Sequence, residues 1–214
     1  MKTIDIENWP RKDLFHFYGG MDYPQYNICA DVDLSGLSAY LKTNRLPAFN
    51  AILYVVCRAA NSIDELRQRI RGDRVVEHDS VHPSFTVLTD DNLFGFCAVE
   101  YTEKTNVFLK RVGEGIEAAK SHPVLADEPG RDDFLFVSSL PWVRFTAISH
   151  PIHMHPVDSI PRISWGKYHS ENGITKMPLS IQVHHALVDG YHVGQFFNRV
   201  QELFDQPRKL FPPK

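Results

Sequence analysis

The chain has 214 residues, 43% of them hydrophobic, which is enough to bury one substantial core and short for two independent domains. Its formal net charge is −3, and its 23 lysines and arginines are scattered rather than gathered in a run, which argues against a nucleic-acid partner. No segment has the pattern of a secretory leader or approaches the roughly 18 apolar residues of a membrane span. We therefore expect a single domain over residues 1–214 and a cytoplasmic protein with no membrane partner.

Cysteines and histidines are the first candidates for chemistry. Cys29, Cys57 and Cys97 lie far apart and lack any metal-ligand spacing, so we interpret them as reduced and mostly buried thiols. Several of the 11 histidines fall in two clusters, at 150–155 and 184–192. Since most histidines in proteins are structural, their positions must decide between them, and we expect His153 and His155 to lie at the surface or in a loop.

Hydrophobic periodicity predicts alternating short elements along the chain. In chain order these are a strand at 28–34, helices at 37–41 and 49–63, strands at 84–88 and 93–101, a helix at 105–120, strands at 134–140, 162–168 and 179–185, and a helix at 191–204. Strands and helices are interleaved without the regular βαβ period. This favours an α/β or α+β sandwich with a mixed sheet.

The strand at 179–185 carries the most informative residues. Alternation places Leu179, Ile181, Val183 and His185 on one face and Ser180, Gln182 and His184 on the other. Adjacent His184 and His185 cannot readily ligate one ion, and no cysteine or glutamate beside them has zinc-ligand spacing, so a metal site is disfavoured. His185 instead stands at the strand end, four residues before Asp189 and Gly190.

An imidazole with a pKa near its unperturbed value of about 6.5 can accept a proton at neutral pH if it is held in place. Asp189 can hold the turn by capping the next helix and by pairing with a cation, and Gly190 permits a close or positive-φ approach. The alternative is that Asp189 only caps a helix and His185 is a satisfied core histidine. The short pattern H-x-x-x-D-G does not separate these two interpretations.

Five segments, taken together, resemble the classical trimeric chloramphenicol acetyltransferase family. They are NWPRKDLFHFY at 8–18, NSIDELRQRI at 61–70, DSVHPSFTVL at 79–88, SSLPWVRF at 138–145 and HHALVDG at 184–190. The resemblance runs from Ile4 to Phe204. Other coenzyme A-dependent acyltransferases share H-x-x-x-D-G, but at this length we expect neither a lipoyl segment nor a second half-domain. The resemblance implies an α/β (α+β) two-layer sandwich with a mixed, mostly antiparallel sheet and helices packed on one face.

The resemblance also implies a mechanism. His185 would be the general base that takes the proton of an acceptor hydroxyl, while acetyl-coenzyme A is the acyl donor in a direct, metal-free transfer. Ser138, in the S-x-x-P-W motif, would stabilise the oxyanion. Asp189 would pair with Arg11 and act by positioning His185 rather than by chemistry.

The residues that bind substrate in the resembled family match this sequence at some positions and differ at others. The matched acceptor pocket comprises Tyr18, Tyr26, Phe94, Phe96, Phe136, His150 and Ser164, and the matched coenzyme A positions are Trp142, Lys167 and Tyr168. Phe96 stands where the family has a small residue, Phe136 where a family member has asparagine, and His150 where it has leucine. These differences bear on the acceptor more than on acetyl transfer. The resemblance further implies a homotrimer with active sites between subunits.

Three functions follow as hypotheses. The first is O-acetylation of the 3-hydroxyl of chloramphenicol, which would confer antibiotic resistance. The second keeps the same machinery with another hydroxyl acceptor, and the third is a trimeric protein that binds apolar drugs without turnover. The combination of His185, Ser138, Asp189 and Arg11 argues against the third, because a binder has no need of it.

Overall fold

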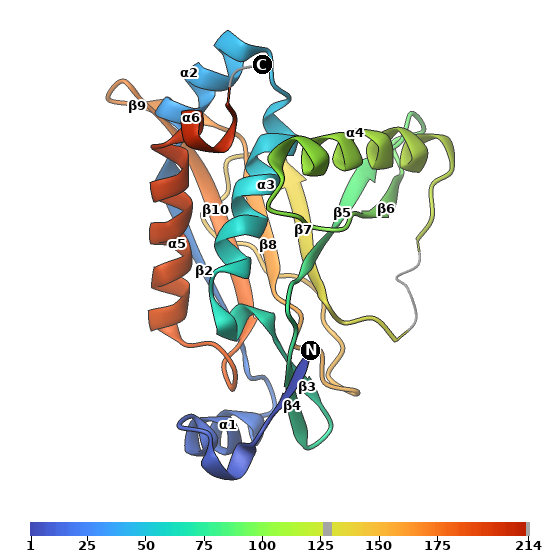
Figure 1. Cartoon of the computed structure of the whole chain (residues 1–214), viewed down its shortest axis with the longest axis vertical. Coiled ribbons are helices and arrows are strands. Elements are labelled where there is room, and N and C mark those ends of the chain that lie inside the picture. The colour runs from blue at the N-terminus through green and yellow to red at the C-terminus, as the bar shows by residue number, and fades with distance from the viewer. Residues whose placement is uncertain (126–129, 213–214) are drawn as a thin grey trace.

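The computed structural model describes residues 1–125 and 130–212 and contains two sheets (Figure 1). The larger sheet has the order β2-β10-β8-β7-β5-β6, and β9 pairs with β10. Its strands are β2 (Gln25–Asp33), β5 (His82–Leu88), β6 (Phe94–Ala98), β7 (Phe134–Leu140), β8 (Arg162–Gly166), β9 (His169–Glu171) and β10 (Ile174–His184). The smaller sheet has the order β1-β4-β3, from β1 (Lys2–Ile4), β3 (Gln68–Arg71) and β4 (Arg74–Glu77).

The larger sheet is mixed. The pairs β5·β7 and β7·β8 are parallel, whereas β10 runs antiparallel to β2, β8 and β9, and β5 runs antiparallel to β6. Three long helices lie together in front of this sheet in Figure 1: α3 (Ala48–Asn61), α4 (Thr105–Ser121) and α5 (Gly190–Phe204). The predicted α+β sandwich with a mixed, mostly antiparallel sheet is confirmed.

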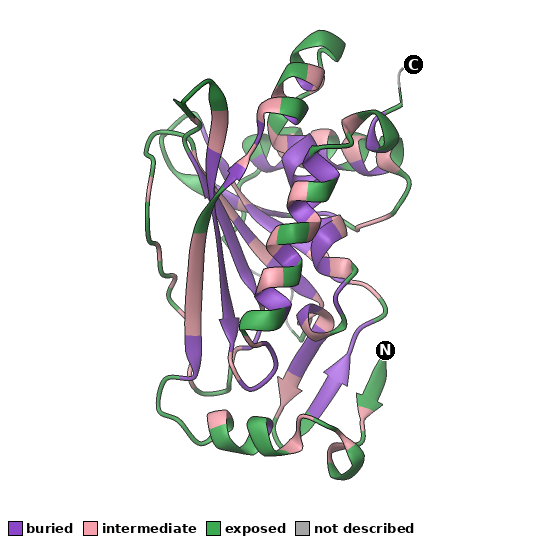
Figure 2. Cartoon of the chain, turned by 90° about the vertical axis from the view of Figure 1, so that its left-hand side faces the viewer, coloured by how far each residue is buried: buried purple, intermediate pink, exposed green. Residues whose placement is uncertain are grey.

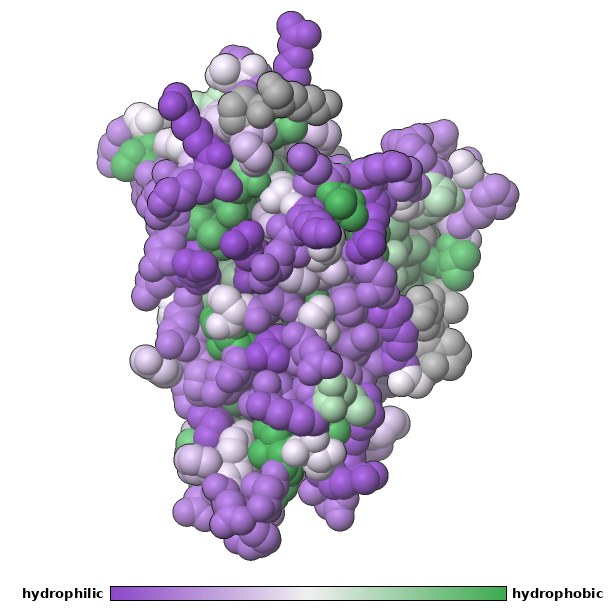
Figure 3. All heavy atoms as spheres, in the orientation of Figure 1, coloured by the Kyte–Doolittle hydropathy of each residue, from purple (hydrophilic) through white to green (hydrophobic). Residues whose placement is uncertain are grey.

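Strand alternation divides the sheet into an apolar inner face and a second face that carries polar and aromatic side chains. Phe85, Val137, Ile163 and Ile181 are at most 2% exposed and belong to the core beneath the helices. Helix α3 is buried almost all round because it packs against both α4 and α5 as well as β5. Helix α5 alternates buried and exposed positions, as an outer helix should (Figure 2). The helix-bearing face of the molecule is mainly hydrophilic (Figure 3).

Short elements account for the differences from the predicted ones. The patterns did not reveal β1, β3, β4 and β9, the helices α1 (Lys12–Gly19) and α6 (Pro207–Leu210), or the 3-10 helices η1 (Ile6–Asn8) and η2 (Asp64–Arg67). Most of these span three or four residues, too few to show a period. Helix α2 (Ser35–Asn44) is longer than expected. Within the described residues, none of the helices combines the length and apolar character that crossing a membrane requires.

Candidate active site

Three segments of the chain hold His185. It follows β10 directly, and its backbone N–H donates to the Pro24 carbonyl at 2.8 Å. Its imidazole stacks on the Tyr18 ring, with 3.7 Å between ring centroids and 6° between planes, and the tilted Tyr26 ring lies 4.6 Å away. The ring is only partly buried. Stacking between aromatic side chains from α1 and β2 therefore sets the orientation of the imidazole.

Asp189 performs both of the roles that its sequence context suggests. Its side chain caps α5 by accepting the Tyr191 N–H at 3.0 Å, and it accepts a hydrogen bond from Arg11 Nη1 at 2.6 Å. The backbone N–H of Asp189 donates to His192 Nδ1, which completes a capping box. Burial opposes ionisation here, but the Arg11 hydrogen bond and the nearby His192 lower the pKa of Asp189 below its ordinary value.

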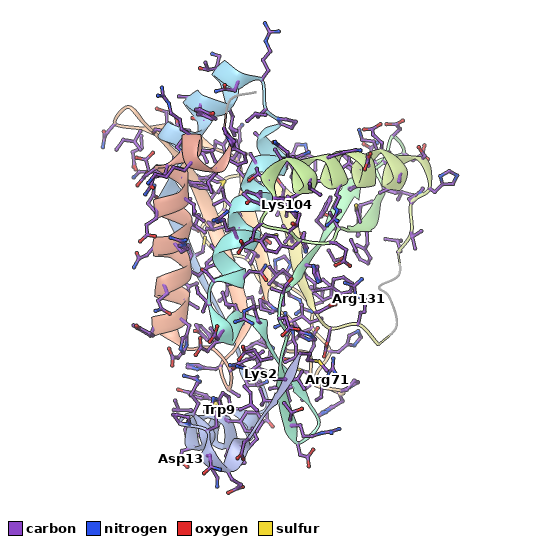
Figure 4. All side chains as sticks on the ribbon, in the orientation of Figure 1. Lys2, Trp9, Asp13, Arg71, Lys104 and Arg131 are labelled. Atoms are coloured by element: carbon purple, nitrogen blue, oxygen red, sulfur yellow. The ribbon has the colours of Figure 1, made fainter. Side chains whose placement is uncertain are left out.

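Gly190 and Arg11 are the two other residues expected to shape the turn between His185 and α5. The expectation for Gly190 was wrong, because it begins α5 without a positive φ, and a Cβ there would meet nothing within 4 Å. Arg11 reaches the turn from the N-terminal segment, where Trp9 packs on Phe15 with 5.9 Å between ring centroids. Figure 4 shows Trp9 beside α1, near the end of the molecule where α5 begins. An ion pair between residues 178 positions apart thus joins the N-terminal segment to the His185 turn.

A second group of predicted residues surrounds a cavity of about 310 Å³. The cavity lies on the sheet face away from the helices, because its strand residues alternate with the core positions. Its lining includes Phe94, Phe96, Phe136, Ser138, His150 and Arg162. Sequence reasoning missed Arg162, whose guanidinium lies over the Phe136 ring, 5.1 Å from its centroid. Arg162 lies two residues before Ser164 on the same strand, so the two side chains share a face, and this alternation could have revealed Arg162.

Hydrogen bonds distinguish the polar residues near this cavity. His150 Nε2 lies 2.9 Å from Ser164 Oγ. The Ser138 hydroxyl has no hydrogen-bond partner among residues 1–125 and 130–212, so it is available to a ligand. His153 and His155 are exposed and lie in the segment between β7 and β8, as predicted.

His185 and Ser138, the predicted base and oxyanion donor, lie far apart within one chain. Ser138 is level with Ser164 across β7·β8, and Ser164 is level with Ser180 across β8·β10. His185 is five residues further along the chain than Ser180, which at about 3.4 Å per residue is roughly 17 Å along the sheet. The structure therefore brings the predicted residues together in two groups. One is His185, Asp189, Arg11, Tyr18 and Tyr26, and the other is Ser138, Ser164, Phe94, Phe96, Phe136 and His150.

The predicted coenzyme A residues lie where the parallel strands β7 and β8 end. Trp142, Lys167 and Tyr168 are all exposed, Trp142 by 69% and Tyr168 by 38%. The Lys167 N–H donates to the Val143 carbonyl at 2.9 Å, and a Cβ at Gly166 would lie 2.8 Å from that oxygen. Glycine at 166 thus lets the two chain segments pack closely and keeps Trp142 near Lys167.

Two other sequence inferences concern histidine and cysteine. His184 is 3% exposed, its Nδ1 accepts the Ala186 N–H at 3.3 Å, and burial lowers its pKa to about 4. No group of three His, Cys, Asp or Glu side chains in the described part of the chain is placed to hold a metal ion. Cys57 and Cys97 are buried, Cys29 is partly buried, and all three are free thiols.

Comparisons with known proteins agree on one family. The family model described as chloramphenicol acetyltransferase matches residues 1–201. Chloramphenicol acetyltransferase 3 of Escherichia coli is 31% identical over 208 residues, covering 96% of this chain and 98% of that protein. A chloramphenicol acetyltransferase of Clostridium perfringens is 32% identical over 203 residues, with coverages of 94% and 93%.

Solved structures extend this result. A chloramphenicol acetyltransferase superposes with a TM-score of 0.86 at 28% identity, over 95% of this chain and 99% of the other. A dihydrolipoamide acetyltransferase of Azotobacter vinelandii gives a TM-score of 0.71 at 19% identity, over 92% of this chain and 88% of the other, which shows a shared fold only. This chain belongs to the chloramphenicol acetyltransferase family, whose members are acyltransferases that use acetyl-coenzyme A.

Proposed function

We propose that this protein transfers the acetyl group of acetyl-coenzyme A to the 3-hydroxyl of chloramphenicol. The observation that carries the proposal is the His185 turn, where Asp189 caps α5 and pairs with Arg11 while Tyr18 stacks on the imidazole. Such a turn serves a base that must keep one orientation. Family membership supplies the reaction class.

In the proposed reaction His185 Nε2 accepts the proton of the acceptor hydroxyl as its oxygen attacks the thioester carbonyl. The negative charge that develops on the carbonyl oxygen is stabilised by the Ser138 hydroxyl, and the coenzyme A thiolate leaves and takes the proton from His185. Trp142, Lys167 and Tyr168 would hold the donor. Lys167 suits a phosphate group of coenzyme A, since it is an exposed lysine. It lies beside the end of β7, the strand that carries Ser138, so a donor bound there could place its acetyl group near Ser138.

The separation of His185 from Ser138 supports a further part of the proposal, a homotrimer with each active site between two subunits. At roughly 17 Å along the sheet the two groups cannot act on one thioester within a single chain, whereas His185 of one copy can face Ser138 of the next. We also infer that residues 1–214 act as one domain, and that the protein is cytoplasmic, in keeping with its three free thiols.

A thiol-release assay tests the activity. The purified protein, mixed with acetyl-coenzyme A and chloramphenicol, should release free thiol continuously, and His185→Ala should abolish the release. The presence of the bulky side chains Phe96, Phe136 and His150 in the cavity lining favours a second candidate, acetylation of a different alcohol. Release with another alcohol but not with chloramphenicol would support that candidate. Absence of release with every alcohol in a chemically diverse panel would contradict both.

Co-expression tests the shared site. His185→Ala and Ser138→Ala are each expected to be inactive, but chains mixed at equal amounts can combine an intact His185 with an intact Ser138 across an interface. Random trimers would then contain about a quarter of the wild-type number of complete sites. Mixed protein with no more activity than the separate variants would contradict an active site shared between subunits.

A further inference from the structure

His150 is placed by a strand, although it lies in the irregular segment between β7 and β8. The side chain of Gln182, which lies on β10 and is 1% exposed, forms two hydrogen bonds with the backbone of His150. Gln182 Oε1 accepts the His150 N–H at 2.8 Å, and Gln182 Nε2 donates to the His150 carbonyl at 3.4 Å. Because both hydrogen bonds come from a buried strand residue, the backbone of His150 has a defined position at the cavity wall.

The imidazole of His150 is directed at one member of a row of three serines. Ser138, Ser164 and Ser180 lie side by side on β7, β8 and β10. Asn27 Nδ2 donates to Ser180 Oγ at 2.7 Å, and His150 Nε2 lies 2.9 Å from Ser164 Oγ. Two of the three hydroxyls are therefore held by side chains, and the third, that of Ser138, lacks a partner within the described residues.

The charge state of His150 suits this contact. Burial lowers the pKa of His150, and the Arg162 guanidinium lowers it further, so the imidazole is neutral at neutral pH. A neutral imidazole either donates to the Ser164 oxygen through Nε2–H or accepts the Ser164 proton at Nε2. Either arrangement restricts rotation of the Ser164 hydroxyl, which is only 1% exposed.

We propose that His150 is a positioning residue that fixes the Ser164 hydroxyl beside Ser138 at the reacting end of the acceptor cavity. This inference rests on the proposed function, since it concerns the same transfer. A hydroxyl that is already oriented stabilises charge in the transition state without reorganisation, whereas a freely rotating one does not. The role therefore affects turnover of the acceptor and leaves acetyl-coenzyme A binding unchanged.

A double-mutant cycle with His150→Leu and Ser164→Ala tests the coupling. A hydrogen bond between neutral groups contributes up to about tenfold in rate, so we expect each variant to lower kcat by roughly fivefold to tenfold. KM for acetyl-coenzyme A should stay at the wild-type value. Because Ser164→Ala already removes the group that His150 holds, the double variant should be within about twofold of the slower single variant. His153→Leu, an exposed histidine of the same segment, is the matched control and should keep wild-type kinetics.

Nitrogen-15 NMR of the imidazole supplies a readout that does not depend on turnover. Ser164→Ala should shift the His150 Nε2 resonance, while His153→Leu should leave it unchanged. If the wild-type enzyme is active, three results would each overturn the positioning role and leave the proposed function intact. They are additive losses in kcat in the double variant, a wild-type kcat in His150→Leu, and an Nε2 resonance that Ser164→Ala does not shift. If the wild-type protein released no thiol with any alcohol, the proposed function would fail first and the positioning role with it.

Discussion

Replacing Asp189 with asparagine isolates the ion pair that links the N-terminal segment to the His185 turn. Asparagine is as good an N-cap as aspartate, so the cap on α5 is kept and only the charge is lost. The remaining Arg11 guanidinium would then lose its hydrogen-bonded counter-ion, and its Nε and Nη2 atoms are already buried without partners. Any loss of stability therefore belongs to the charge of Asp189, whose nearest cationic partner is Arg11.

The size of the loss follows from the exposure of the pair. Removing one partner of a fully buried ion pair costs about 3–5 kcal/mol, and exposed pairs contribute below about 1 kcal/mol. The Arg11 and Asp189 side chains are 13% and 29% exposed, which places the pair between these limits. We expect Asp189→Asn to lower the free energy of unfolding by about 2 kcal/mol. Turnover should fall by about a hundredfold, since misplacing a catalytic group by 1 Å has an effect of that order.

Urea unfolding and thiol release on the same preparations measure both effects. Glu202→Gln is the matched control, because it removes a carboxylate charge from an exposed pair with Arg199 on the same helix. That variant should change the free energy of unfolding by less than about 0.5 kcal/mol and keep full turnover. An Asp189→Asn protein with wild-type unfolding and full turnover would refute the reasoning. A destabilised but fully active protein would refute the positioning of His185 alone.

Three further changes probe the oxyanion donor, the donor site and a buried histidine. Ser138→Ala should lower kcat by about a hundredfold to a thousandfold, and Ser139→Ala, whose side chain lies on the opposite face of β7, should not. Lys167→Ala should raise KM for acetyl-coenzyme A with little change in kcat, whereas Lys42→Ala, on α2, should leave both unchanged; equal effects would contradict the donor site. His184, with its pKa lowered to about 4, stays neutral in the folded protein while the unfolded chain binds a proton below about pH 6.5, so stability should fall by at most about 3 kcal/mol as the pH drops from 6.5 to 4. His184→Gln should flatten that dependence in urea unfolding.

The sequence by itself determined most of the fold and part of the site. Hydrophobic alternation and helical spacing located the long helices and the strands of the larger sheet, because each element must bury one face. The segment at 184–190 contains both the strand end and the helix cap, so the positions of His185 and Asp189 in the fold follow from local chemistry, whereas their proposed roles in catalysis came from the family resemblance. The short strands and α1 were not predictable, since three or four residues show no period and their stability comes from what they pack against.

Only the tertiary structure decided how these parts meet. The pairing of Arg11 with Asp189, which the family resemblance implied, joins residues 178 positions apart, and no spacing along the chain encodes such a contact. Strand register likewise placed Ser138 roughly 17 Å along the sheet from His185 and put Ser164 within hydrogen-bond reach of His150. The physical reason is that alternation along a strand determines which side chains share a face, whereas the order and register of strands determine which of them touch.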